Sequence, residues 1–383
     1  MKNPDRIPPI RLVLLFGAML ALLCGLDAAL VRLGLNAPYY SVELGSIHGL
    51  LMVYGFLGTA ISLERAVALQ SDRRGVTWWA YLGPAASALA VITVLVQSTT
   101  GTLLGGRLIP ALLWGAAMAF LLAMYRVIWH KQSAHAVLIQ VLGAFAGLGG
   151  ILLWGRGYEI AQIVPWWTMF LVLTIIGERV ELARISFLRQ GTEKRVVAEA
   201  SILTVLLPIT LMVPQWGYPL FGITLVATIL DVCWHDVARN TIRGVGLTRF
   251  MAACMLSGYG WALLSGGIWL VCGPVFSGYG YDTVVHALTV GFALSMVMAH
   301  APVIVPAIAR RTVPYHQAMW AVWALLQAGL IVRTISGARE ANDGWQLGGA
   351  LDVVAVLAFV LMTVSLIAIS GRKRHEETAP QPY

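Results

Sequence analysis

The sequence predicts an all-α, polytopic membrane protein that crosses the bilayer twelve times and keeps both termini in the cytoplasm. Of the 383 residues, 58% are hydrophobic and 11% are charged, whereas soluble domains carry about 25% charged residues. Apolar runs of roughly 20 residues, the length that spans a bilayer as a helix, recur along the chain. We expect twelve spans, near 11–34, 43–69, 77–98, 104–129, 134–154, 160–188, 196–214, 217–238, 247–272, 282–309, 315–336 and 347–370.

The positions of the Lys and Arg residues support this number of spans. Every connection on the side of the termini carries positive charge, such as Arg73 and Arg74 after the second span and Arg310 and Arg311 after the tenth. This is the pattern of the positive-inside rule, and one helix more or fewer would destroy it. The net charge of +8 therefore reflects topology and not nucleic-acid binding, since no basic run is interleaved with aromatic residues outside the membrane.

The chain is expected to form one transmembrane domain over residues 1–370, followed by a disordered cytoplasmic tail over 371–383. No connection is long enough to separate domains. The four cysteines are scattered without a CxxC or CxxCH motif, which argues against a disulfide framework, a zinc ribbon and covalently attached haem.

A weak internal repeat suggests three units of four helices. "ISLERAVAL" (61–69) resembles "IIGERVELA" (175–183), four spans later. "GFALSMVMAH" (291–300), a further four spans on, echoes "GFLGTAISLE" (55–64), and each pairs Gly-Phe with a polar group nine residues after the Gly.

Two histidines lie within apolar spans at a similar depth from the outer surface. His48 is near the start of the second span and His286 near the start of the tenth. A single histidine of this kind most often bonds a backbone carbonyl, but a level pair on two helices is able to clamp a haem iron from both faces. Arg333 is then a candidate partner for a haem propionate, with Arg339 as a second candidate.

A second group of polar residues is expected at the cytoplasmic ends of the spans. His300 lies 14 residues after His286, roughly 21 Å deeper along the same helix, so it cannot serve the same metal. We interpret this group as a proton route, a second metal or cofactor site, or a set of structural ion pairs. Its members are His300, Glu64, Glu178, Arg179, Glu181, Arg184, Asp231, His235 and Asp236.

Twelve helices with level histidines on the second and tenth resemble the catalytic subunit of the haem-copper oxidases. The His-x-His motif of the tenth helix is missing, because residue 288 is Leu, and spans six and seven hold no histidine. The copper site of those enzymes is therefore absent, and no turnover reaction is assigned.

The sequence is more similar to the NnrS family, whose members are haem- and copper-containing membrane proteins linked to nitric oxide metabolism and nitrosative stress. The similarity is carried by "HGLLMVYGFLGTA" (48–60), "GYGWALLSG" (258–266) and "HALTVGFALSMVM" (286–298). His48 and His286 are the positions that carry over as haem ligands. "AHAPVIVPAIARR" (299–311) departs from that family's pattern.

This resemblance implies a b-type haem protein of the bacterial inner membrane, with haem b as cofactor and copper or a second haem as a further candidate. Nitric oxide or another small gas would be its ligand, and quinol or another electron carrier its redox partner. The alternatives are a secondary transporter and a haem or metal assembly factor. Only "MAHAPVIVPAI" (298–308), with Pro302 and Pro306, suggests the broken helix that is typical of transporters.

Overall fold

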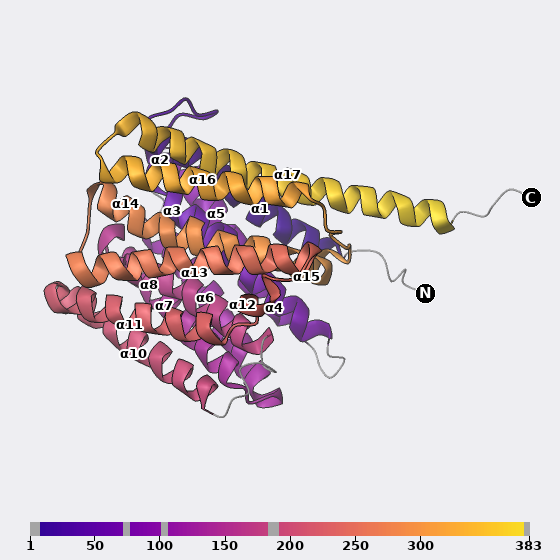
Figure 1. Cartoon of the computed structure of the whole chain (residues 1–383), viewed down its shortest axis with the longest axis horizontal. Helices are drawn as coiled ribbons and strands as arrows, with labels where there is room; N and C mark the ends of the chain where they lie inside the picture. Colours follow the sequence, from indigo (N-terminus) through magenta and orange to yellow (C-terminus); the bar gives the residue numbers. More distant parts are fainter. Residues whose placement is uncertain (1–7, 72–76, 101–105, 183–190, 379–383) are drawn as a thin grey trace, which may run out of the picture.

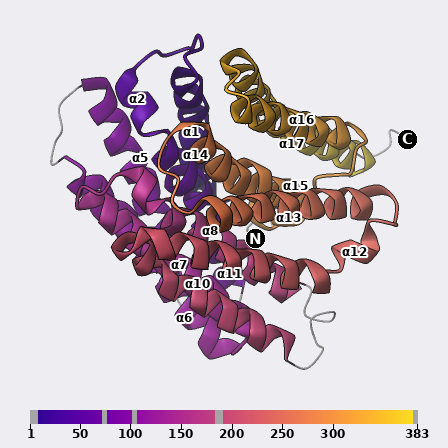
Figure 2. The same cartoon turned by 60° about the vertical axis from the view of Figure 1, so that its left-hand side comes forward.

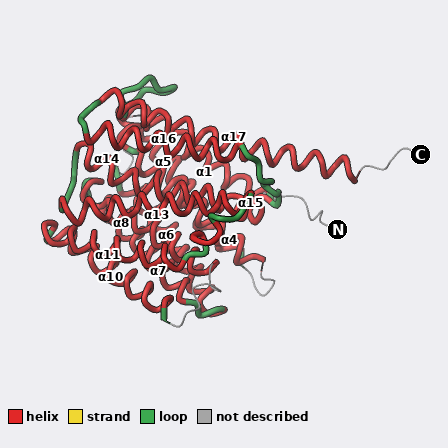
Figure 3. The backbone as a smooth tube through the Cα atoms, in the orientation of Figure 1, coloured by secondary structure: helices red, strands yellow, loops and turns green. Residues whose placement is uncertain are grey.

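The computed structural model describes residues 8–71, 77–100, 106–182 and 191–378. These residues are helical throughout apart from loops and turns, without a strand among them (Figure 3). Twelve helices are long and apolar enough to cross a membrane, which confirms the predicted class and number of spans. The chain is therefore a multi-pass protein of a lipid bilayer. The spans are Pro9–Arg32 (α1), His48–Gln70 (α3, η1 and α4), Trp78–Thr100 (η2 and α5), Leu108–Lys131 (α6), His135–Gly155 (α7), Ile160–Leu182 (α8), Thr192–Met212 (α10), Pro214–His235 (α11), Gly246–Cys272 (α13), Gly278–Ala309 (α14, η3 and α15), Ala318–Ala338 (α16) and Asn342–Ser370 (in α17).

The N-terminal end of α1 and the C-terminal end of α17 lie at the same end of the bundle (Figure 1), as an even number of spans requires. We call this the termini end and the opposite end the distal end. Two short helices lie outside the spans, α2 (Val42–Ser46) and α12 (Ala238–Thr241). Helix α17 runs from Asn342 to Thr378 and projects beyond the bundle (Figure 1). It thus enters the segment expected to be a disordered tail, whose Arg, Lys and Glu residues are compatible with helix; residues 379–383 lie outside the described part.

The second, sixth and tenth spans form the centre of the bundle. Their most apolar windows are 67%, 78% and 61% buried inside the protein, above those of the other nine candidate spans. Helix α16 and helix α17 instead pair at the periphery beside α1 (Figure 2). A site built on the central spans is therefore shielded from lipid by their neighbours.

Two of the central spans contain a π-helical segment at matching places. Segment η1 (Leu51–Gly58) follows α3 (His48–Leu50) and leads into α4 (Thr59–Ser71), while η3 (Ala287–Leu294) follows α14 (Gly278–His286) and leads into α15 (Ser295–Ala309). Each carries a glycine against which a neighbour packs, since a Cβ on Gly291 would lie within the Trp261 side chain and one on Gly55 would lie 2.9 Å from Ala21 Cβ. Such segments are frequent at functional sites.

The expected break at Pro302 and Pro306 does not occur, because α15 continues through both prolines. Transmembrane helices tolerate proline where neighbouring groups satisfy the freed carbonyls. The irregular part of this span is η3, which contains no proline.

Replacing Gly222 by Ala is expected to lower the free energy of unfolding by about 1–3 kcal/mol, the usual cost of overpacking. A Cβ on Gly222, in α11, would lie 2.5 Å from the backbone N of Leu270 and 2.6 Å from the carbonyl O of Gly266, both in α13. Thermal unfolding in detergent measures the loss. Gly267→Ala is the matched control because a Cβ there meets nothing within 4 Å; an equal loss in both variants would contradict the packing explanation.

Candidate functional site

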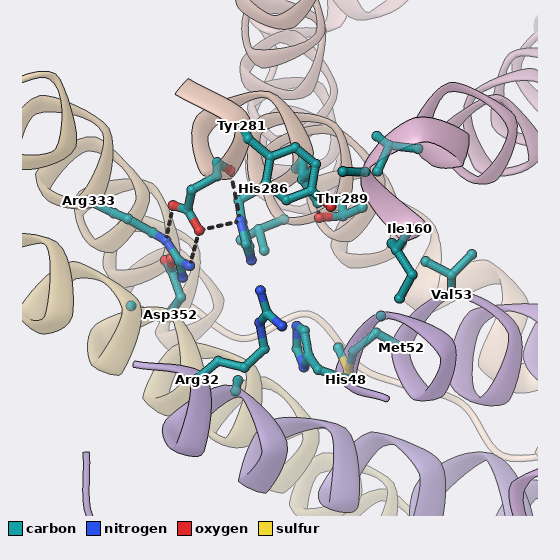
Figure 4. A pocket seen from close by; sticks show the side chains of 18 of the residues that line it. Arg32, His48, Met52, Val53, Ile160, Tyr281, His286, Thr289, Arg333 and Asp352 are labelled. Atoms are coloured by element: carbon teal, nitrogen blue, oxygen red, sulfur yellow. Dashed lines mark hydrogen bonds and ion pairs between the residues drawn. The ribbon is translucent and has the colours of Figure 1, made fainter. Parts of the chain in front are cut away.

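A pocket of about 750 Å³ lies among the distal halves of the central spans. Its walls come mainly from α1, α3, η1, α8, α14, η3, α16 and α17, and combine many apolar side chains with the charged and polar ones labelled in Figure 4. Helices α16 and α17 thus complete a site that the central spans begin. The apolar side chains lining it include Leu26, Ala29, Met52, Val53, Leu57, Ile160, Val164, Trp167, Val285, Val290, Leu294, Val353 and Val356.

His48 and His286, the two histidines expected at a similar depth, both line this pocket. Their ring centroids are 6.5 Å apart and their ring planes are inclined by 19°. The Nδ1 atom of His48 lies 2.8 Å from the carbonyl O of Gly25, and that of His286 lies 2.8 Å from the carbonyl O of Asp282. Each ring is therefore oriented through Nδ1, and within the described chain its Nε2 has no hydrogen-bond partner.

Asp282 organises the polar side chains beside His286. Arg333 donates to both of its carboxylate oxygens, at 2.8 and 2.6 Å, and the Trp345 indole N–H donates at 2.8 Å. The guanidinium of Arg333 also lies 5.3 Å from the centroid of the Trp345 ring. His286 Nδ1 is 3.2 Å from one Asp282 oxygen. Sequence reasoning missed Asp282, although its spacing of four residues before His286 is the signal that would have revealed it.

Arg333, the candidate propionate partner, lines the pocket and is paired with Asp282. Arg339 follows the end of α16 and does not line the pocket. Arg32, the last residue of α1, does line it and forms no ion pair within the described part of the chain. Arg32 and Arg333 are thus the arginines that line the pocket, whereas Arg339, the second propionate candidate, does not.

Asp352 is a further pocket residue that the sequence analysis missed. It lies in α17, only 4% exposed, and lines the pocket. Neither of its carboxylate oxygens has a hydrogen-bond partner among the described residues. Its sequence signal is a lone acid within the apolar run "GGALDVVAVLAFV" (348–360).

Toward the termini end, an ion-pair network joins the second span to the sixth. Arg65, in α4, lies 3.0 Å from Glu178 and 3.5 Å from Glu181, both in α8. Its chain neighbour Glu64 lies 2.6 Å away. The three carboxylates named by the sequence analysis therefore meet around Arg65, which the sequence analysis did not name.

A second network joins the sixth span to the tenth. Arg179 donates to both oxygens of Asp236, at 2.9 and 2.8 Å, and lies 3.1 Å from His300 Nε2. Tyr259 donates to Asp236 at 2.6 Å. Burial alone would raise the pKa of Asp236, but the Arg179 guanidinium and the Tyr259 hydroxyl hold this pKa below its usual value.

His300 is engaged through both ring nitrogens. Its Nδ1 lies 2.6 Å from the carbonyl O of Met296, and Arg179 has no lone pair to offer, so His300 Nε2 accepts and Nδ1 carries the proton. No group of three or more His, Cys, Asp or Glu able to hold a metal occurs in the described ranges. A second metal or cofactor at His300, including copper, stays a prediction.

The remaining members of the expected cluster lie elsewhere. His235 Nδ1 is 3.2 Å from Asp231, which also receives two hydrogen bonds from Arg195. This group therefore forms a third pairing on α10 and α11, outside the two networks. Arg184 lies outside the described residues.

Comparison with known proteins gives one distant relative of described function. The chain is 27% identical over 232 residues to a triacylglyceride transporter of Mycolicibacterium smegmatis, an alignment that covers 54% of this chain and 40% of the relative. This chain thus spans less than half of the relative's length. No solved structure matches the chain.

These matches correct the resemblance drawn from the sequence. A family described as "Domain of unknown function (DUF8744)" matches residues 11–368, so membership of the NnrS family is wrong. The short segments around His48 and His286 that carried the resemblance are a small part of that match. With the transporter relative, this also overturns nitric oxide handling, nitrosative stress, electron transfer and kinship to haem-copper oxidases as the function. Haem ligation by His48 and His286, which no match tests, stays a prediction, and the chain belongs to the DUF8744 family.

Proposed function

We propose that the chain is a secondary transporter of the bacterial inner membrane that moves a largely apolar molecule with a polar end. The observation that carries this proposal is a pocket at the distal end, with two ion-pair networks farther along the same central spans toward the termini. The relative, a triacylglyceride transporter by name, supports the same class of function. The transporter that was the alternative interpretation of the sequence thus becomes the leading one.

The positive-inside rule gives the orientation in this proposal. Lys and Arg gather in the connections at the termini end, which places that end in the cytoplasm. The pocket then faces the outside, and the described conformation is outward-facing. Quinol or another electron carrier has no place in this proposal.

The two networks act as the inner gate. Arg65 and Glu178 tie the second span to the sixth, and Arg179 and His300 tie the sixth to the tenth. Glu64-Arg65 and Glu178-Arg179 occupy matching places four spans apart, and His300 follows Gly291 by as many residues as Glu64 follows Gly55. This spacing supports three units of four helices. Opening toward the cytoplasm requires the three central spans to separate at this layer.

Asp352 is the candidate proton carrier that couples transport to the membrane gradient. An uncompensated carboxylate at membrane depth is costly, and such residues commonly mark substrate or proton pathways. Asp352 is buried, lacks a hydrogen-bond partner among the described residues and borders the pocket. A proton on Asp352 and a molecule in the pocket would therefore influence each other directly.

Filling the pocket tests the proposal. Val290→Trp places a large side chain in the pocket wall, and we expect at least a tenfold slower uptake of a fluorescent fatty acid or triacylglycerol into proteoliposomes. Val205→Trp is the matched control, since Val205 is 64% exposed on the outer face of α10. Wild-type uptake of both probes no faster than into empty liposomes, or equal slowing by both variants, would contradict the proposal.

A further inference from the structure

The pocket histidines are prepared as metal ligands. A histidine that donates its Nδ1 proton to a carbonyl carries its lone pair on Nε2, the form that binds a metal. Gly25 accepts from His48, and the carbonyl of Asp282 accepts from His286, with the Asp282 carboxylate 3.2 Å from the same nitrogen. A carboxylate or carbonyl behind the ring is the usual second contact of a metal-bound histidine, because it fixes the tautomer and the ring orientation.

The separation of the two rings suits one metal between them. Metal–nitrogen bonds of about 2 Å on each side put the two ring centroids about 6 Å apart, and the observed separation is 6.5 Å. Figure 4 shows both imidazoles facing the same open space, into which Arg32 also reaches. Neither ring nitrogen that faces this space is used by another described residue.

Two imidazoles alone do not complete a metal site. A bare zinc ion takes four ligands from protein or water, and the described residues offer no third His, Cys, Asp or Glu in a metal-holding group here. A planar macrocycle such as a porphyrin supplies four equatorial nitrogens and leaves two axial positions free, which are the two that a facing pair of histidines fills.

The remainder of the pocket fits a flat, apolar molecule with acidic substituents. Its volume of about 750 Å³ falls within the range of about 300–1,000 Å³ that is common for cofactor and ligand sites. Apolar side chains such as Val164, Val290 and Leu294 line it. Arg32 also lines it and forms no ion pair within the described ranges, so its charge is available to a carboxylate of the ligand.

We propose that this pocket binds a metalloporphyrin such as haem, with Nε2 of His48 and Nε2 of His286 as the axial ligands. This inference rests on the proposed function only for the choice of pocket and names the ligand class of that same site. Porphyrin binding is measured in the absence of transport, so a failure of either proposal leaves the other open.

The test is an absorption spectrum of the detergent-purified full-length protein, with and without added haemin, oxidised and then reduced with dithionite. Sharp α and β bands in the reduced wild type are expected, as for haem with two histidine ligands. His48→Ala and His286→Ala are expected to lose these bands. His130→Ala is the matched control, because His130 is an exposed histidine at the termini end and its removal leaves the spectrum unchanged.

A ligand exchange separates coordination from a merely structural role of the histidine. His286→Met is expected to retain haem with shifted bands and a higher reduction potential, because methionine in place of one histidine raises the potential. Wild-type protein that takes up no haemin, or bands that persist in both alanine variants, would overturn the proposal. If haem binds, its transfer to an apo-globin trapped inside proteoliposomes identifies it as cargo, whereas retention identifies it as resident; both results support the site.

Discussion

Asp352→Asn abolishes proton-driven accumulation of the transported molecule while leaving its downhill exchange in place. This is the largest functional effect that we expect from a change of one atom. The amide has nearly the shape of the carboxyl group but cannot take up or release a proton. Asp352 is 4% exposed and borders the pocket, so the substitution changes the coupling group without altering the route.

The measurement compares uptake into proteoliposomes with and without an imposed pH gradient. We expect the gradient to raise wild-type accumulation at least tenfold and to leave that of Asp352→Asn unchanged. Asp343→Asn provides the matched control, since Asp343 is an exposed acid in the first turn of the same helix. Gradient-driven accumulation that survives in Asp352→Asn would exclude Asp352 as the proton carrier.

Arg179→Met lowers the free energy of unfolding by about 3–5 kcal/mol, the usual cost of removing one partner of a buried ion pair. The side chains of Arg179 and Asp236 are 6% and 0% exposed, so the loss of the guanidinium leaves a desolvated carboxylate without a cation. The low pKa of Asp236 means that this carboxylate is charged at neutral pH in the intact pair. Thermal unfolding in detergent measures the loss.

The double variant Arg179→Met/Asp236→Asn tests the reason for that loss. It removes both charges, and exchanging a buried pair for neutral groups is often close to neutral, so most of the stability is expected to return. Arg195→Met is the comparison for a pair near the surface, because Arg195 is 51% exposed and such pairs contribute about 0–1 kcal/mol. A double variant no more stable than Arg179→Met would show that the charge of Asp236 is not the cause.

The twelve spans could be predicted from the sequence because each depends on local composition. An apolar run of sufficient length forms a helix wherever it stands in a bilayer. The distribution of Lys and Arg among the connections gives independent support for the number of spans. The π-helical segments could not be predicted, since Gly55 and Gly291 resemble any other glycine in an apolar helix. Their role depends on Trp261 and on other neighbours that are distant in sequence.

The sequence could predict the site only where a residue's depth along its span determines its position. His48 and His286 were expected at one level, and they line the same pocket. Which arginine meets which carboxylate depends on how the helices are rotated and placed, and a single sequence does not give this. The sequence suggested Arg333 as a partner of a haem propionate, whereas in the structure Arg333 pairs with Asp282. Asp352 was not identified at all, because a single acid in an apolar run does not show that its carboxylate lacks a hydrogen-bond partner.

The ion pairs of the central layer also set an order of events during synthesis. Arg65 is made 113 residues before its partner Glu178, and Arg179 is made 121 residues before His300. At about 5–20 residues per second, each arginine enters the membrane roughly ten seconds ahead of its partner on the later span. Until then its long side chain is expected to reach for the cytoplasmic interface. The centre of the bundle would therefore be incompletely packed until the tenth span is inserted. A chain truncated before Asp236, which receives two hydrogen bonds from Arg179, would expose Arg179 to the machinery that removes unassembled membrane proteins.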